Sequence, residues 1–174
     1  MKFSSQEEYG LRCLLRIARQ GGRASLTIPE ISEAEGLSSF YVAKLLRILR
    51  RAGLVKSARG KIGGYTLARP PGQITVGEAL AALGGRLFES DFCSDHAGIE
   101  KACTSAVDCS IRSLWRAVQD VVDQVLSKTT LLDLLRSEQE MACLISPLVQ
   151  ITDSTAKSSP APASLEARGS KQSD

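Results

Sequence analysis

Three cysteines lie within one polar stretch of the chain, at Cys93, Cys103 and Cys109, with nine and five residues between them. Thiolate sulfur is a soft ligand that suits iron–sulfur clusters, zinc or copper(I). Because the stretch is poor in apolar residues, burial of three thiols in a hydrophobic core is disfavoured there. These cysteines are therefore predicted to hold a metal centre.

The single histidine of the chain, His96, follows Cys93 by three residues. It would complete a Cys₃His zinc site. The alternative is that this lone histidine on a polar loop is only exposed to water. Wide cysteine spacing is unusual for structural zinc, which normally uses close Cys-x₂–₄-Cys pairs. Cys13 is predicted to be a small core residue, and Cys143 is assigned no role.

The elements before the cysteines read as three helices and a hairpin. Helical spacing and capping residues predict helices over Ser4–Gln20, from Thr27 to Gly36, and over Ser39–Ala52. Two short strands, 53–58 and 65–68, flank a glycine-rich turn. This order predicts a mainly α fold with a small β-wing, the winged helix–turn–helix.

The elements around and after the cysteines are mostly helical. A helix is expected at Val76–Leu83, and a long apolar stripe predicts another over Ser110–Leu126. A short helix is expected from Thr129 or Thr130 to about Arg136. The chain beyond Ser146 is rich in Ser, Ala and Pro, and is predicted to be disordered.

Charge is distributed unevenly along the chain, although the net charge is only +3. Residues 1–72 hold 13 Lys and Arg against 5 Asp and Glu, whereas residues 73–145 hold 6 against 11. A basic first half predicts a polyanionic partner. No apolar run approaches the roughly 20 residues of a membrane span, and the acidic N-terminus is unlike a signal peptide, so a cytoplasmic protein without a membrane partner is expected.

Enzymatic signatures do not appear in the sequence. One histidine excludes a histidine pair, the glycine-rich turn lacks the Ser or Thr that follows the lysine of a phosphate loop, and no Gly-x-Ser-x-Gly elbow occurs. The protein is therefore expected to be no enzyme and to have no small-molecule substrate.

The third helix and the wing carry the residues expected to contact DNA. In a winged helix the third helix enters the major groove, while the wing reaches the minor groove or the phosphates. The alternative is that these basic residues form only a solvated face, or serve a protein-binding module. The candidate DNA-binding residues are Ser38, Ser39, Tyr41, Lys44, Arg47, Arg59 and Lys61.

Several motifs in this chain match a known family. The sequence resembles the iron–sulfur regulators of the IscR and NsrR type, the Rrf-two family, from residue 1 to about residue 138. The motifs are Glu8-Tyr9-Gly10-Leu11-Arg12, Gly53-Leu54-Val55, Arg59-Gly60-Lys61-Ile62-Gly63-Gly64-Tyr65-Thr66-Leu67, Ile74-Thr75-Val76-Gly77-Glu78, the three loop cysteines, Leu114-Trp115 and Thr130-Leu131-Leu132-Asp133-Leu134-Leu135.

The resemblance implies a homodimeric transcription factor that binds a double-stranded DNA operator and holds an iron–sulfur cluster on the three loop cysteines. A 2Fe–2S cluster is favoured over a 4Fe–4S cluster. The long helix would cross to the twofold partner. In one branch of the family a histidine three residues after the last cysteine is a ligand, but Arg112 stands there in this chain. In the other branch a carboxylate from the partner's first helix is a ligand, and Glu8 matches it; the alternative role for Glu8 is helix capping.

A second departure lies in the third helix, where Ala43 replaces the acidic residue with which the cluster-cycle regulators select DNA. The expected function is that of a transcriptional repressor that senses iron–sulfur status, redox state or nitric oxide. The alternative is a zinc-stabilised or thiol-switch DNA-binding regulator without a cluster. The expected organisation is a DNA-binding domain at 1–72, a connecting helix at 73–87, a cluster-binding loop at 88–109, a dimerisation helix and short C-terminal helix at 110–145, and a disordered tail at 146–174.

Overall fold

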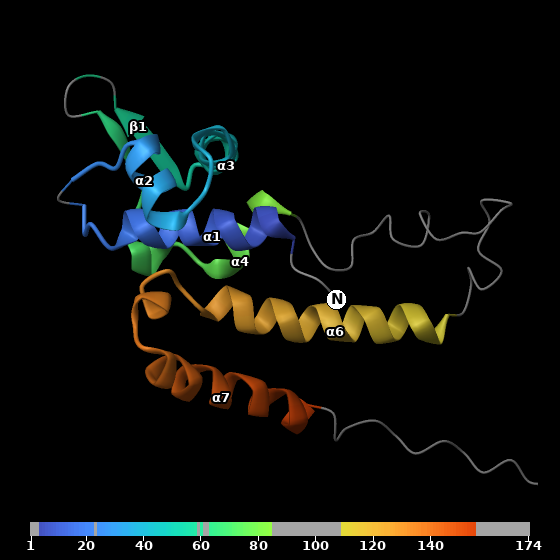
Figure 1. The fold of residues 1–174 in the computed structure, drawn as a ribbon. Helices are drawn as coiled ribbons and strands as arrows, with labels where there is room; N and C mark the ends of the chain where they lie inside the picture. Colours follow the sequence, from blue (N-terminus) through green and yellow to red (C-terminus); the bar gives the residue numbers. More distant parts are fainter. Residues whose placement is uncertain (1–3, 23, 59, 61–62, 85–108, 156–174) are drawn as a thin grey trace, which may run out of the picture.

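The computed structural model describes residues 4–22, 24–58, 60, 63–84 and 109–155, with the backbone alone at 149–155. The described part is mostly helical and carries one two-stranded sheet, which confirms the predicted fold class. Figure 1 shows the first three helices and the hairpin grouped in one body, with two long helices beneath it. The predictions for Arg59, Lys61, Cys93, His96, Cys103 and the tail beyond Thr155 lie outside the described residues.

The helix–turn–helix is built from α1 (Ser5–Ala18), α2 (Ile28–Glu35) and α3 (Ser39–Arg51), close to the predicted bounds. Each begins at a hydroxyl cap, and the caps of α1 and α2 are reciprocal capping boxes with Glu7 and Glu30. Gly36 ends α2 with a φ of 65°, a conformation that glycine adopts without steric cost. The chain can therefore turn at once from α2 into α3.

The wing is the antiparallel pair β1 (Val55–Ala58) and β2 (Gly64–Leu67), in the register Val55 with Leu67. Leu26 forms a further bridge to Tyr65, whose N–H donates to the Leu26 carbonyl at 2.7 Å. The glycine-rich turn is sterically required, because a Cβ on Gly63 would lie 2.7 Å from the Ala58 carbonyl oxygen. The wing is thus fixed to the loop before α2 as well as to itself.

The hydrophobic core does not end at residue 72, where the sequence reasoning placed a domain boundary. It continues into α4 (Val76–Leu83), which follows a 3₁₀ turn, η1 (Pro71–Gln73). Leu131, far along the chain, is also fully buried in this core. The fully buried large side chains are Leu14, Ile31, Leu45, Leu46, Leu49, Leu54, Ile74, Leu83 and Leu131.

The segment after the long helix returns to the N-terminal body and joins it through the backbone. The N–H of Val76 donates to the Thr129 carbonyl at 2.8 Å, and the N–H of Leu131 donates to the Ile74 carbonyl at 2.9 Å. The short helix expected here is instead a single 3₁₀ turn, η2 (Asp133–Leu135), whose Asp133 carboxylate accepts a hydrogen bond from the Thr130 hydroxyl at 2.6 Å. Thr129 is extended, and Thr130 forms an antiparallel bridge to Thr75 in the chain before α4.

Two long helices follow, and the second includes residues that were predicted to belong to a disordered tail. α6 (Ser110–Lys128) runs beneath the body, and its N-terminal part extends beyond it (Figure 1). α7 (Glu138–Thr155) packs along α6 and includes residues 146–155, which were predicted to be disordered. A Ser137–Glu140 capping box precedes α7, and the helix continues through the internal Pro147 despite the unfavourable composition. None of the described helices is both long enough and apolar enough to cross a membrane.

Candidate DNA interface and metal site

The turn between α2 and α3 fixes the N-terminus of α3 by hydroxyl hydrogen bonds. The N–H of Tyr41 donates to Ser38 Oγ, and Ser39 Oγ donates to Ser32 Oγ, each at 3.2 Å. Ser38 and Ser39 both remain exposed, as a DNA contact requires. Because the Ser38 oxygen is the acceptor in its bond, the hydroxyl hydrogen is left to donate to a phosphate.

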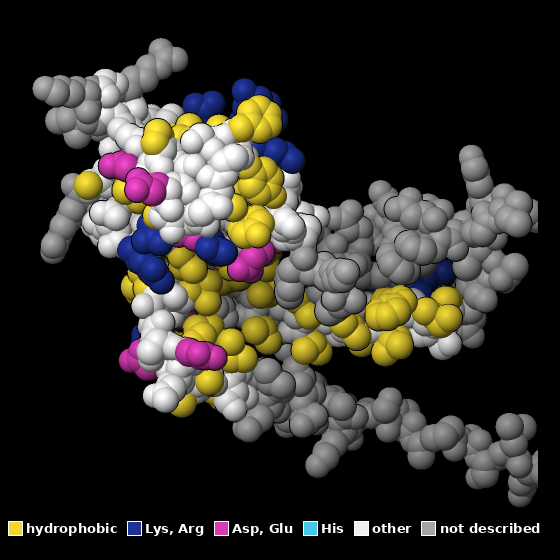
Figure 2. Space-filling model, viewed as in Figure 1, with side chains coloured by type: hydrophobic (Ala, Val, Ile, Leu, Met, Phe, Trp, Pro, Cys, Tyr) yellow, Lys and Arg dark blue, Asp and Glu magenta, His cyan; other side chains and the backbone are white. Residues whose placement is uncertain are grey.

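The outward face of α3 is basic. Lys44 and Arg47 are exposed on it, whereas Val42, Leu45 and Leu46 are fully buried on the opposite face. Figure 2 shows Lys and Arg side chains gathered over α3, with apolar surface beside them. This face has the charge and the helix orientation that a major-groove contact needs.

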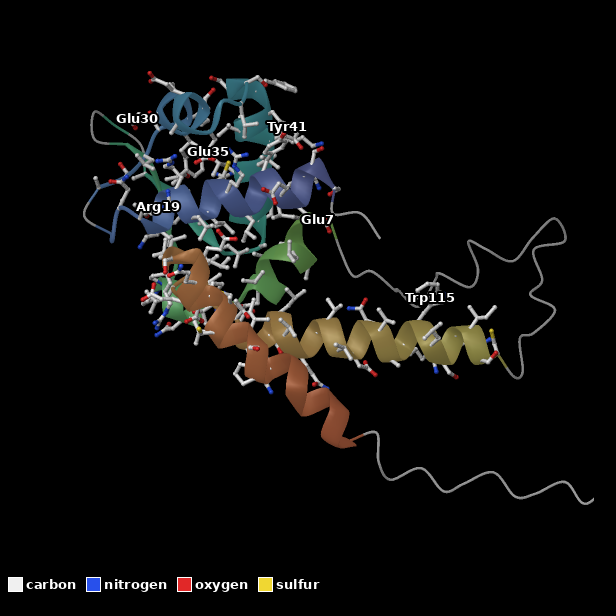
Figure 3. All side chains as sticks on the ribbon, turned by 60° about the horizontal axis from the view of Figure 1, so that its bottom comes forward. Glu7, Arg19, Glu30, Glu35, Tyr41 and Trp115 are labelled. Carbon is white, nitrogen blue, oxygen red and sulfur yellow. The ribbon has the colours of Figure 1, made fainter. Side chains whose placement is uncertain are left out.

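Tyr41 occupies a different position from the other candidate residues. It is half-buried and meets Tyr9 of α1 edge to face, with ring centroids 6.1 Å apart (Figure 3). The Lys44 ammonium lies 5.9 Å from the Tyr41 ring centroid, within cation–π range. Tyr41 therefore orients α3 on α1 and supports Lys44.

One exposed residue of the same helix was not among the predicted contacts. Phe40 leaves 85% of its side chain exposed, the largest fraction among the exposed large hydrophobic residues of the described chain. The available signal was its spacing, four residues before Lys44 and seven before Arg47, which places it on their face. Helical periodicity predicts which apolar residues of α3 face the core, and Phe40 lies outside that buried stripe.

A buried carboxylate links the first two helices. Glu35 at the end of α2 accepts hydrogen bonds from Arg12 Nε at 2.9 Å and from Arg16 Nε at 2.8 Å (Figure 3). Burial alone would raise the pKa of Glu35, but the hydrogen bonds from Arg16 and Arg12 together outweigh it and lower that pKa. The ion pairs hold α2, and thereby α3, against α1.

Glu35→Gln is expected to lower the free energy of unfolding by about 1 kcal/mol at pH 7. The expected loss is this small because Arg12 and Arg16 are partly exposed, so water screens their attraction to Glu35. A depressed pKa in the folded state contributes stability that is present above the ordinary value near 4.3 and is lost as pH falls through the folded value. The variant should therefore lose less stability than the wild type between about pH 5 and 3. Urea unfolding at several pH values measures this, with the exposed neighbour Glu33→Gln as control; parallel pH curves for the wild type and Glu35→Gln would contradict it.

Of the three predicted cysteine ligands, Cys109 is the one that the structure describes. It caps the N-terminus of α6, where the N–H of Arg112 donates to Cys109 Sγ at 3.4 Å, and its thiol is free and half-buried. A helix N-terminus favours negative charge on such a sulfur. Within the described residues no group of three His, Cys, Asp or Glu side chains could hold a metal ion.

Glu8 lies in the first turn of α1 and is exposed. The capping role considered for it belongs to Glu7, whose carboxylate accepts from the Ser4 N–H at 2.6 Å. Cys13 is a fully buried core residue, as predicted, and burial raises the pKa of its thiol to about 11. Cys143 is exposed on α7.

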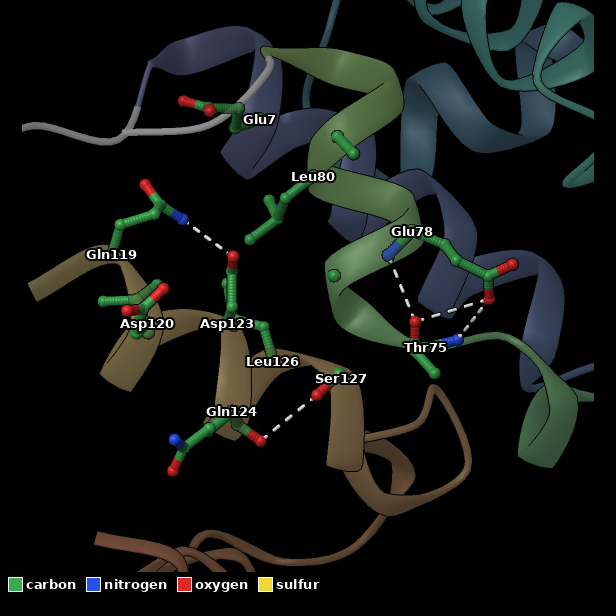
Figure 4. Close-up of a pocket in the computed structure, with 13 residues that line it drawn as sticks. Glu7, Thr75, Glu78, Leu80, Gln119, Asp120, Asp123, Gln124, Leu126 and Ser127 are labelled. Carbon is green, nitrogen blue, oxygen red and sulfur yellow. Dashed lines mark hydrogen bonds between the residues drawn. The ribbon is translucent and has the colours of Figure 1, made fainter. Parts of the chain in front are cut away.

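A groove of about 720 Å³ lies between α4 and α6 (Figure 4). The carboxylates of Glu7, Glu78, Asp120 and Asp123 are among the side chains that line it. Gln119 is buried there and donates to Asp123 Oδ1 at 2.7 Å. Because this side is acidic, it repels a polyanion, in contrast to the basic face of α3.

The helix–turn–helix, the wing and the basic face of α3 together define a winged-helix DNA-binding protein. The family of iron-dependent transcriptional regulators called Rrf2 matches residues 3–137, so the chain belongs to the Rrf2 family. The related proteins are named transcriptional regulators, which confirms that this chain is a DNA-binding regulator and not an enzyme.

Individual relatives share about a third of their residues with this chain. The transcriptional regulator CymR of Bacillus subtilis is 34% identical over 134 residues, which cover 77% of this chain and 89% of CymR. IscR of Cronobacter sakazakii is 31% identical over 139 residues, covering 80% of this chain and 83% of IscR. The solved structure of B. subtilis CymR, described as a global cysteine regulator, has a TM-score of 0.64 at 33% identity and covers 77% of this chain and 95% of that one.

Proposed function

We propose that this protein is a homodimeric repressor whose affinity for a double-stranded DNA operator depends on an iron–sulfur cluster held by Cys93, Cys103 and Cys109. A 2Fe–2S cluster is favoured, with Glu8 of the partner subunit as the fourth ligand. The observation that carries the proposal is that Cys109 caps α6, and that the chain after α6 pairs with residues 74–76 and places Leu131 in the core into which α3 also packs. A change at the loop is thereby coupled to the helix that contacts DNA.

The chemistry at Cys109 fits an iron–sulfur ligand. Its thiol is free, is only half-buried and points its sulfur at a helix N-terminus, where negative charge is stabilised. When bound, a cluster would supply sensitivity to redox state, iron supply or nitric oxide. The role of this chain is to hold α6 in one orientation when the ligand set is complete.

The homodimer is supported by the free end of α6. Ile111 and Leu114 expose 62% and 57% of their side chains, and Trp115 lies beside them on the part of α6 beyond the body (Figure 3). Three large apolar residues on one helical stripe are costly in water, and a twofold copy of α6 would cover them. Two copies of α3 would then meet two half-sites of one operator.

The cluster is tested by anaerobic purification with iron, sulfide and zinc analysis and a visible spectrum. Broad absorption between about 320 and 600 nm with about two iron and two sulfide per chain is expected. Cys109→Ser should lose it but remain folded, because serine caps a helix at least as well. Cys143→Ser, which changes an exposed cysteine on α7, is the matched control and should keep the colour.

A second candidate function rests on the relative described as a global cysteine regulator, which is as similar to this chain as the IscR relatives are. In this second candidate function, the loop cysteines of this chain would bind zinc or act as a thiol switch. A colourless wild-type protein that contains zinc, or that contains no metal after reconstitution with iron and sulfide, would replace the first candidate with the second.

A further inference from the structure

Phe40 lies outside the hydrophobic core of the residues that the structure describes. It stands at the second position of α3 with 85% of the side chain exposed, while the core stripe of α3 faces the other way. An exposed phenylalanine gains little burial energy in the fold. Phe40 shares the exposed face of α3 with Lys44 and Arg47, so its ring is available to whatever those cations bind.

The neighbours of Phe40 indicate the chemistry of that partner. Ser39 precedes it, and the exposed Lys44 and Arg47 follow on its face of the helix, so one aromatic ring lies among cationic and hydroxyl side chains. Figure 1 shows α6 below α1, and α3 on the opposite side of α1. A partner helix that covers α6 would therefore leave Phe40 exposed.

DNA offers one apolar group in the major groove, the C5 methyl of thymine, and phenylalanine is among the side chains that contact it. The N-terminal residues of a recognition helix are those that reach the base edges. We propose that Phe40 contacts a thymine methyl in each half of the operator and so selects thymine at that position. The inference rests on the DNA-binding role of α3, and it concerns what α3 reads there.

The proposal is tested by selection from a random duplex library with the full-length protein, followed by sequencing of the bound fraction. The wild type should enrich a thymine at one position of each half-site. Phe40→Ala should still bind DNA but lose that preference, while Phe40→Leu should keep part of it. Because the side chain is exposed, Phe40→Ala should unfold at the wild-type temperature, which separates a lost contact from a lost fold.

A second step isolates the methyl group in the best selected duplex. Replacement of the selected thymine by deoxyuridine removes only that methyl, and should weaken wild-type binding about fivefold per half-site. Phe40→Ala should bind both duplexes equally. Equal weakening of the wild type and Phe40→Ala, or an unchanged thymine preference in Phe40→Ala, would overturn the proposal. A wild type that enriches no duplex would instead contradict the operator-binding function itself.

Discussion

Leu114→Asp is expected to convert the protein to a monomer. Leu114 exposes 57% of its side chain on the α6 stripe, and a twofold interface would bury it twice. Each buried leucine contributes about 1.5–3 kcal/mol, and an unpaired carboxylate in its place adds a desolvation cost. The dimer dissociation constant should therefore rise by about 1,000-fold.

Light scattering coupled to size-exclusion chromatography measures this at micromolar protein concentration. Ser113→Asp is the matched control, because it places the same charge one residue earlier on the opposite, exposed face of α6. It should remain a dimer. A wild-type protein that is already monomeric, or a Leu114→Asp variant that stays dimeric, would exclude this stripe as the dimer interface.

Arg47→Ala is expected to weaken operator binding by about 100-fold in the dimer, because both copies of α3 lose a cation that faces the DNA. If each Arg47 neutralises one phosphate, the slope of log affinity against log salt should fall by about 2. The expected effect has two measurable parts, a loss of affinity and a shallower salt dependence.

Fluorescence anisotropy with a labelled duplex at several salt concentrations separates these two parts. Arg116→Ala removes the same charge from the exposed surface of α6 and serves as the control. It should change affinity by less than about threefold, since a distant charge is screened at physiological ionic strength. Equal losses for Arg47→Ala and Arg116→Ala would mean that net charge, and not the α3 face, determines binding.

Local sequence signals predicted those elements whose ends are marked by caps and glycines. Thr75 with Glu78 predicted the start of α4, and Gly36 predicted the end of α2, because these side chains act on their own backbone. α7 was missed beyond Ser146 because the Ser, Ala and Pro content there favours disorder, whereas the capping box that precedes this helix lies further back, at Ser137 and Glu140. The extended residues before η2 were missed because Leu131 pairs with the distant Ile74, and local spacing carries no signal for such a pairing.

In the candidate site, too, local spacing predicted some residues correctly and gave no signal for contacts between helices. Lys44 and Arg47 were predicted from helical spacing, and the structure places them on the exposed face of α3. Tyr41 was predicted by residue type, yet its ring contacts Tyr9 of another helix. Phe40 was overlooked because helical periodicity assigns apolar residues to the core, and only the packed structure shows how exposed it is.

The backbone pairing of residues 129–131 with residues 74–76 has a mechanical consequence. Because these hydrogen bonds and the buried Leu131 hold the C-terminal end of α6 to the N-terminal body, α6 and that body are expected to move together. The 19 residues of α6 span about 28 Å, so a displacement of about 2.5 Å at Cys109 swings α6 through about 5°. In the proposed dimer α3 would turn with α6, and the angles of the two protomers would add. A signal that displaces Cys109 would therefore change the orientation of one α3 helix relative to the other.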